Sequence, residues 1–210
     1  MATTAYRQQV DEERKHRTRA RLIDAARRVF VAQGYHAPKI SDIVTEAGSG
    51  QGTFYRHFAD KREIFDALVD EVLVDLAAGF NTAFATLPEN VEEYRDASLL
   101  SVHAAAHVLM EYRAEALLFL KEGPTIDANF EARVTETMDG FASLAQGFLD
   151  HAIRAGFARP CDSAVVAQCL VGIALRHLER GLPDGIDLNH TVREIVDFAF
   201  LGFGPAQQES

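Results

Sequence analysis

Residues 48 to 61 read GSGQGTFYRHFADK and combine residue types that are suited to binding a polyanion. Glycines at 48, 50 and 52 leave the backbone bare, four aromatic rings follow within five positions, and Arg56 and Lys61 add positive charge. Exposed N–H groups at the start of a helix bind phosphate, and polar side chains on such a helix can reach base edges in a DNA groove. The stretch therefore predicts contact with nucleic acid.

A second set of chemically active side chains lies further along the chain. His103, His107 and Glu111 are spaced at i, i+4 and i+8, so they share one helix face, as the ligands of a metal site would. No cysteine and no second histidine pair lies nearby, which favours a polar pocket lining or a buried, hydrogen-bonded histidine over a metal site. Without a Ser-His-Asp or Cys-His signature or a phosphate loop, we expect no enzyme, catalytic residue, metal or cofactor. An α-helical enzyme that uses the His103 face is the alternative.

Charge is divided unevenly along the 210 residues. Residues 1–62 carry 12 Lys and Arg against 7 Asp and Glu, whereas residues 63–210 carry 9 against 24, which gives the net charge of −10. A basic head on an acidic body can dock on DNA while the body stays away from the polyanion. The longest apolar run, seven residues at 169–175, is too short to span a membrane. We therefore expect a cytoplasmic protein without membrane contact.

Apolar residues recur every three or four positions almost throughout the chain, and no segment alternates apolar and polar residues as a strand does. We therefore expect an all-α fold of about nine helices. The expected helices cover residues 18–33, 39–47, 51–58, 60–88, 91–112, 117–121, 130–155, 163–180 and 191–203, the first beginning at Thr18 as N-cap. The last two carry apolar stripes that require a partner, which is either the core of the same chain or a second subunit.

Two short helices are expected on either side of a turn that contains Gly48 and Gly50, and their lengths and this turn are typical of a helix-turn-helix. Gly48 suits a turn with positive φ, and Gly50 can serve as an N-cap without a side chain. Gly52 removes bulk where the second of these helices would approach a phosphodiester backbone. Phe54 and Phe58 can face the core. The side chains that then face outward, toward bases and phosphates, are Gln51, Thr53, Tyr55 and His57.

Residues 18–65 resemble the DNA-binding head of the TetR family of transcriptional repressors. The resemblance rests most on the run IVTEAGSGQGTFYRHFADKREIF, together with Phe30, Gly34 and Tyr35. It implies a fold of nine or so helices, with a helix-turn-helix DNA-binding domain in residues 1–62 and an effector-binding, dimerising domain in residues 63–210. It also implies that the last two helices form the dimerising pair, which favours a second subunit as their partner.

The residue patterns and the resemblance give three sets of candidate site residues. The expected DNA contacts are Arg17, Thr18, Arg19, Lys39, Ser41, Gly50, Gln51, Gly52, Thr53, Tyr55, His57 and Lys61. The expected effector pocket is Phe80, Phe84, His103, His107, Met110, Phe119, Met138 and Phe141. The expected dimer interface is Val166, Leu170, Ile173, His177, Val192, Ile195, Val196, Ala199 and Phe200. Because Lys39 stands where the family often has a hydroxyl residue, we expect Ser41 to cap the second helix.

Together these features predict a TetR-like, ligand-responsive transcriptional regulator that binds a palindromic operator in double-stranded DNA as a homodimer. A small apolar effector, bound in the body, is expected to release it. We expect a repressor, although an activator of the same architecture fits the sequence too. A sequence-tolerant DNA architectural protein is the other alternative, and a low ratio of specific to non-specific affinity would favour it.

Overall fold

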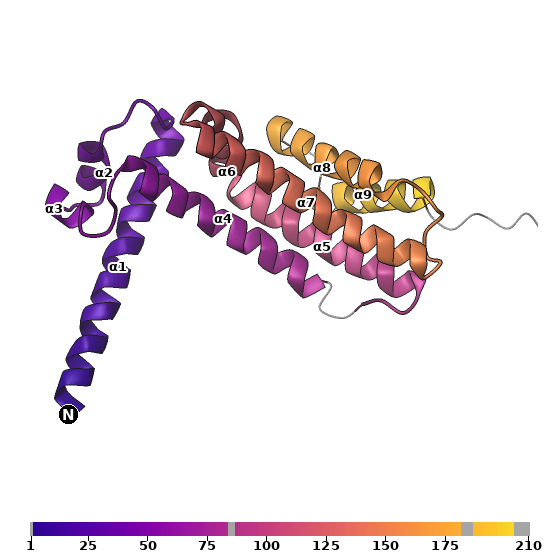
Figure 1. The fold of residues 1–210 in the computed structure, drawn as a ribbon, viewed down its shortest axis with the longest axis horizontal. Helices are drawn as coiled ribbons and strands as arrows, with labels where there is room; N and C mark the ends of the chain where they lie inside the picture. Colours follow the sequence, from indigo (N-terminus) through magenta and orange to yellow (C-terminus); the bar gives the residue numbers. More distant parts are fainter. Residues whose placement is uncertain (1, 84–86, 182–186, 204–210) are drawn as a thin grey trace, which may run out of the picture. The chain divides into compact units, whose positions relative to one another are not determined.

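The computed structural model describes residues 2–83, 87–181 and 187–203, with side chains for 6–78, 87–181 and 187–200. Within these ranges the chain forms nine α-helices and one 3-10 turn and no strand, which confirms the expected all-α fold (Figure 1). The elements are α1 Ala2–Gln33, α2 Ile40–Glu46, α3 Gln51–Phe54, α4 Lys61–Ala83, α5 Val91–Glu111, α6 Arg113–Glu122, η1 Gly123–Thr125, α7 Ala128–Arg154, α8 Ser163–Arg180 and α9 Leu188–Phe203. Of these described helices, none combines the length and apolar character needed to span a bilayer.

The helices form two compact units. The first unit comprises Met1–Val72 together with Ala114–Glu122, and the second comprises Leu73–Arg113 together with Gly123–Ser210. The first unit therefore extends past residue 62, where we expected the domains to divide. It does so because the first half of α4 supplies buried residues to the core of the head, and because α6, distant in sequence, packs with α1.

Aromatic rings hold α1 and α4 together in the first unit. Phe30 and Phe65 are both fully buried, and their ring centroids lie 5.4 Å apart in an edge-to-face arrangement. Tyr35 contacts both rings, at 5.7 Å from Phe30 and 4.9 Å from Phe65. Such pairs add about 0.5–1.5 kcal/mol beyond the burial of their area. These three rings therefore join α1, the loop after it and the first half of α4 in one buried cluster.

In the second unit, α7 packs against α8 and α5 packs against α9. Tyr94, Leu149 and Ala152 are buried in its core, and an ion pair of 2.6 Å joins Arg95 of α5 to Asp197 of α9. Three of the helices begin at residues whose side chains accept a backbone N–H three positions on: Asn90, Asp127 and Asp162. These N-caps explain why α5, α7 and α8 start within two residues of the positions expected from the sequence.

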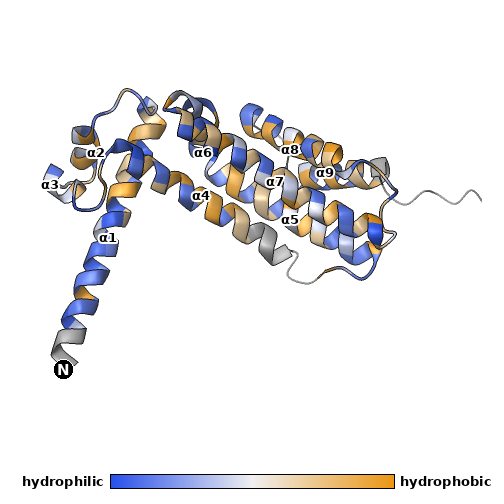
Figure 2. Ribbon diagram, viewed as in Figure 1, coloured by the Kyte–Doolittle hydropathy of each residue, from blue (hydrophilic) through white to orange (hydrophobic). Residues whose placement is uncertain are grey.

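The first helix begins much earlier than expected. It starts at Ala2, and the prediction that Thr18 caps it is wrong, because the Thr18 hydroxyl lies inside the helix and donates to the carbonyl of Arg14 at 2.9 Å. All side chains from 6 to 17 are exposed, and this half of α1 is mostly hydrophilic (Figure 2). Polar residues with good helix propensity continue the helix here without an apolar stripe.

The loop that follows α1 is held from two sides. The ammonium of Lys61, in the first turn of α4, donates to the carbonyls of Tyr35, His36 and Pro38 at 2.8, 3.2 and 3.1 Å. An ammonium has three N–H donors, so these carbonyls occupy all of them, and burial lowers the pKa of Lys61. On the other side, the Glu122 carboxylate of α6 accepts the N–H of Tyr35 at 2.6 Å. One loop therefore connects α1, α4 and α6.

Removing the side chain of either Lys61 or Glu122 should destabilise the head. We expect Lys61→Met and Glu122→Ala each to lower the free energy of unfolding by about 1–3 kcal/mol, because each leaves backbone groups without a charged partner. Urea denaturation followed by circular dichroism measures the change. The exposed Lys39 provides the control, since Lys39→Met should change stability by less than about 0.5 kcal/mol. Equal stability of Lys61→Met and the wild type would contradict a structural role for Lys61.

Candidate nucleic-acid interface

A tight turn separates α2 from α3. Ala47 ends α2, and Gly48 follows with a φ of +60°, in the left-handed region that glycine adopts easily. Gly50 then serves as the N-cap of α3, with an extended backbone (φ −95°, ψ 158°) and a carbonyl that accepts the N–H groups of Thr53 and Phe54. The expected roles of Gly48 and Gly50 in the turn are thus confirmed.

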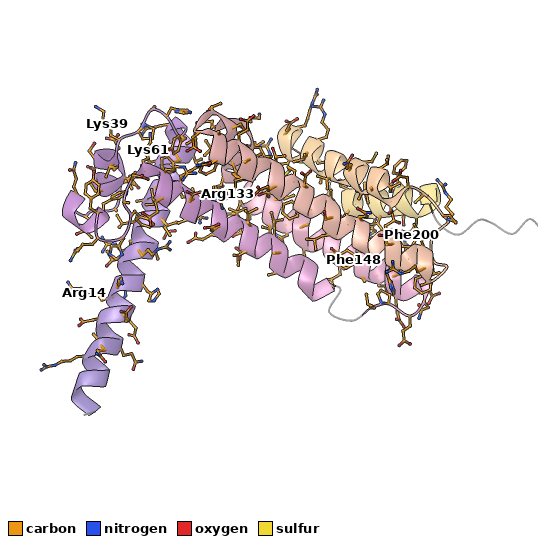
Figure 3. The ribbon with its side chains drawn as sticks, viewed as in Figure 1. Arg14, Lys39, Lys61, Arg133, Phe148 and Phe200 are labelled. Carbon is orange, nitrogen blue, oxygen red and sulfur yellow. The ribbon has the colours of Figure 1, made fainter. Side chains whose placement is uncertain are left out.

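Asp42, rather than Ser41, closes the start of α2. Its carboxylate accepts the backbone N–H of Lys39 at 2.7 Å, and the Ser41 hydroxyl only donates to the same carboxylate at 3.4 Å. The prediction of a Ser41 cap is therefore wrong. A carboxylate in the first turn also suits the positive end of the helix dipole. The Lys39 side chain is left exposed at the start of α2 (Figure 3).

The segment formed by α3 and the turn after it, residues 51–58, has a buried and an exposed side. Phe54 and Phe58 are 0% and 2% exposed, whereas Tyr55 between them is 56% exposed. This confirms the predicted orientation of the aromatic residues. Of the other candidate residues in the segment, Gln51 and Gly52 are exposed, and Thr53 and His57 are half-buried. Their contact with DNA stays a prediction.

Neither the backbone conformation nor the packing of the first unit requires a glycine at position 52. Gly52 does not adopt a positive φ, and a Cβ placed on it would have no described atom within 4 Å. Glycine inside a helix is about 0.5–1 kcal/mol less favourable than alanine. A bare backbone at this exposed position therefore makes sense if another molecule approaches it closely.

The cations of the head divide into two groups. Some hold the fold: Arg21 donates to the carbonyl of Ala47 at 2.7 Å, Arg28 pairs with Glu46 at 2.5 Å, and Lys61 holds the loop after α1. Others are exposed and form no ion pair with any described carboxylate; these are Arg17, Lys39 and Arg56. The second group is available to bind phosphates. Charge counting along the sequence could not separate the two groups.

His57 lies among cations from two elements. Burial lowers its pKa from the usual 6.5, and the neighbouring charges of Arg56, Lys15 and Arg19 lower it further. The guanidinium of Arg19 also lies 5.1 Å from the centroid of the Phe58 ring. The exposed part of α1 therefore continues the positive surface of residues 51–58. Lys15 and Arg56 are additions to the candidate residues that the sequence indicated.

The residues expected to line an effector pocket are distributed over both units. Phe119 is buried in the first unit, in α6. In the second unit His103, Met138 and Phe141 are half-buried and His107 and Met110 are exposed, while Phe84 and the side chain of Phe80 lie outside the described residues. The pocket stays a prediction. Within the described side chains, no group of three or more His, Cys, Asp or Glu could hold a metal ion.

The residues expected in the dimer interface on α8 and α9 differ in how exposed they are in the single chain. Val192, Val196 and Ala199 are buried within the single chain, so they belong to its core. The remaining expected residues are half-buried: Val166, Leu170, Ile173, His177, Ile195 and Phe200. Two large apolar residues outside the expected set are exposed instead, Val165 at 55% and Phe198 at 67%. The spacing of three residues between Ile195 and Phe198 could have identified Phe198 from the sequence.

Known proteins share both the sequence of the head and the fold of the whole chain. Residues 22–68 match the family model described as bacterial regulatory proteins, tetR family. The uncharacterized HTH-type transcriptional regulator YdgC of Bacillus subtilis is 27% identical over 90% of this chain and 93% of its own length. The HTH-type transcriptional activator FasR of Mycolicibacterium smegmatis is 34% identical, but the match covers only 38% of this chain and 36% of FasR.

Among solved structures, a bacterial regulatory protein in the tetR family from Rhodococcus RHA1 superposes with a TM-score of 0.75 at 21% identity. The superposition covers 90% of this chain and 98% of that one, so the likeness in fold extends through the body as well as the head. With the helix-turn-helix geometry described above, these matches identify residues 22–68 as a helix-turn-helix head of the tetR family of bacterial regulatory proteins, and they show that the chain has the fold of a solved member of that family.

Proposed function

We propose that the protein is a ligand-responsive repressor that binds a palindromic DNA operator as a homodimer. The two α3 segments enter major grooves about 34 Å apart, or a modest multiple of that distance. Gln51, Tyr55 and His57 contact base edges there, and Lys39 and Arg17 contact the adjacent phosphates. DNA binding is sequence-specific because side chains, and not only charge, face the groove.

The observation that carries this proposal is the exposure of Tyr55 between two buried rings. A tyrosine that is 56% exposed leaves a large apolar surface in water, and Phe54 and Phe58 prevent it from turning inward. The bare backbone of Gly52 and exposed cations lie next to it. A buried connector between helices would need none of these features, whereas a surface that enters a DNA groove can use all three.

Exposed apolar side chains support dimerisation through α8 and α9. Phe198 and Val165 are accessible in the single chain, and burying one such side chain contributes about 1.5–3 kcal/mol. In a dimer with two-fold symmetry each contact occurs twice, so two residues contribute four buried side chains. Two-fold symmetry of the protein in turn requires a palindromic operator.

The position of α6 supports effector control of the head. Arg27 of α1 bonds to Glu71 of α4 at 2.8 Å, and its Nε lies 3.7 Å from the buried carboxylate of Glu115 in α6. Glu122 of the same helix holds the loop after α1. An effector in the body that displaces α6 would disturb both contacts, and a coupling of about 1–3 kcal/mol is enough to release an operator.

Selection of bound DNA from a random pool tests the proposal. We expect a recovered sequence with two inverted half-sites, and we expect the protein to reduce transcription in vitro from a promoter that contains it. Recovery of no preferred sequence would favour an architectural DNA-binding protein instead. Increased transcription from the same promoter would identify an activator and contradict the repressor assignment.

Gly52→Ala should change stability and DNA binding in opposite directions. The added methyl meets no protein atom and favours the helix, so the free energy of unfolding should rise by about 0.5–1 kcal/mol. Operator affinity should nevertheless fall by a factor of about ten or more, because the methyl keeps the backbone away from the DNA. The control is Gly140→Ala, at an equally open position in α7, which should stabilise the protein without affecting binding. Unchanged affinity of Gly52→Ala would argue against close approach.

Phe198→Glu should weaken the dimer. Two carboxylates placed in an apolar contact would cost several kcal/mol of association free energy, so we expect mainly monomer at micromolar concentration. Sedimentation equilibrium measures the fraction of dimer. The control is Leu100→Glu, at a similarly exposed apolar residue of α5, which should leave the oligomeric state of the wild type unchanged. A dimer of wild-type affinity in Phe198→Glu would exclude this face of α9 from the interface.

A further inference from the structure

The side chain of Arg113 closes the C-terminal end of α8. Its Nε donates to the carbonyl of Leu178 at 2.8 Å, and its Nη2 donates to the carbonyl of Glu179 at 2.7 Å. Both carbonyls lie in the last turn of the helix, where no backbone N–H of the same helix is available to them. A guanidinium can donate to two oxygens at once, and its positive charge suits this end of the helix dipole. A residue 65 positions earlier in the chain therefore caps α8.

Gly181 forms the turn against which Arg113 lies. Its backbone has φ +72° and ψ 173°, a combination that essentially only glycine adopts, and its N–H donates to the carbonyl of His177 at 2.8 Å. A Cβ at this position would lie 3.6 Å from Nη2 of Arg113. The guanidinium and the turn are therefore in contact, and a substitution at either residue disturbs the same place.

Arg113 is also the first residue of α6, where its charge is unfavourable. The N-terminal end of a helix is the positive end of its dipole, so a cation there does not stabilise α6. The preceding residue, Tyr112, caps α5 with φ −103° and ψ 28°, outside the helical region. Because α5 does not continue into α6, a continuous helix does not set the direction of α6. The contact of Arg113 with α8 supplies a fixed point for the start of α6 instead.

The other end of α6 holds the loop after α1. Arg113 belongs to the second unit, and Ala114–Glu122 belong to the first. In the first unit the carboxylate of Glu122 accepts the N–H of Tyr35 at 2.6 Å. A helix of ten residues is about 15 Å long and is hydrogen-bonded along its length, so it moves as one piece. A displacement at Arg113 would therefore be passed on to Glu122.

We propose that Arg113 is a positioning residue for DNA binding, through which the last turn of α8 controls the contact between α6 and the loop after α1. The inference rests on the proposed function, because α8 carries part of the proposed dimer interface and the loop belongs to the proposed DNA-binding head. Pairing of two subunits along α8 fixes that helix, and Arg113 then fixes the start of α6. The hydrogen bond from Tyr35 to Glu122 is stabilised as a result, so dimerisation favours the form of the head that binds DNA. By linkage, operator binding favours the dimer to the same extent.

Amide hydrogen exchange, measured by NMR on the protein without DNA, tests the connection. In Arg113→Met the Tyr35 N–H should exchange about ten times faster than in the wild type, because the start of α6 is no longer held. The N–H of Ala47 lies in the same head but bonds to the carbonyl of Ile43 in α2 at 2.9 Å, and it should keep its wild-type rate. Gly181→Ala disturbs the same turn from the side of α8 and should accelerate exchange at Tyr35 in the same way.

Two further variants separate this connection from general effects on α8. Arg113→Lys keeps a cation that can donate to the same carbonyls, so it should restore most of the protection of the Tyr35 N–H. Arg176→Gln removes another arginine near the end of α8, which is exposed and pairs with Glu179 at 3.7 Å within the same helix. Arg176→Gln should leave the exchange rate of Tyr35 unchanged.

Operator affinity provides the second measurement. Fluorescence anisotropy is recorded with the selected operator, at protein concentrations where each variant is fully dimeric by sedimentation equilibrium. Arg113→Met should bind about tenfold more weakly than the wild type, whereas Arg176→Gln should bind with wild-type affinity.

Faster exchange confined to α8 in Arg113→Met would overturn the inference, as would equal acceleration at Ala47 and Tyr35. Wild-type operator affinity of Arg113→Met, or an equal effect of Arg176→Gln, would overturn it too. Failure of the wild type to bind any DNA would instead overturn the proposed function, and the exchange rates would still decide whether Arg113 holds the loop after α1.

Discussion

A helix of four residues, Gln51–Phe54, cannot keep its shape in water without tertiary contacts. The position of α3 therefore depends on two buried rings, Phe54 within it and Phe58 just after it, and on the turn that Gly48 and Gly50 make before it. The direction of every exposed side chain on this segment follows from the packing of those rings. In this head, the exposed surface that we propose to enter DNA lies on the same short segment as the buried rings, so a change in the packing of the rings would also move that surface.

Positive charge in the head serves two purposes that the sequence does not distinguish. Arg21, Arg28 and Lys61 are held by backbone carbonyls or a carboxylate, so they stabilise the fold. Lys15 and Arg56 have no such ion-pair partner among the described residues. Lys61 illustrates the difference best. The family resemblance places it at a DNA contact, yet three carbonyl oxygens occupy its donors in the free protein. Its effect on DNA binding would then arise from the position of α4 and the loop, and would not require a phosphate.

Local patterns predicted those features that depend on neighbouring residues. The spacing of Phe54 and Phe58 gave the correct orientation of Tyr55, and the bounds expected for α8, residues 163–180, are those observed. The sequence does not indicate the early start of α1, because the exposed half of that helix has no apolar stripe. The family pattern favours a hydroxyl residue as the cap of α2, so it does not identify Asp42.

Features that depend on distant residues could not be predicted in the same way. A stripe of apolar residues shows that a helix face is covered, but it does not identify what covers it. Val192 and Val196 are buried within one chain although their stripe suited a dimer equally well. In the same way, the order of helices along the chain gave no sign that α6 packs with the head, because Glu115 and Glu122 have their partners some ninety residues earlier.

In the effector control proposed above, the contact between α6 and the loop after α1 would set the size of the signal. One hydrogen bond to a carboxylate, such as that from the Tyr35 N–H to Glu122, contributes about 1.5–3 kcal/mol net. Allosteric coupling between an effector and an operator is typically about 1–3 kcal/mol. Loss of a single contact of this kind would therefore be sufficient for the proposed control, without a large rearrangement of the head. Lys61 donates hydrogen bonds to the same loop and lies only three residues after Phe58. A shift of the loop would therefore be transmitted to the end of the α3 segment through these few residues.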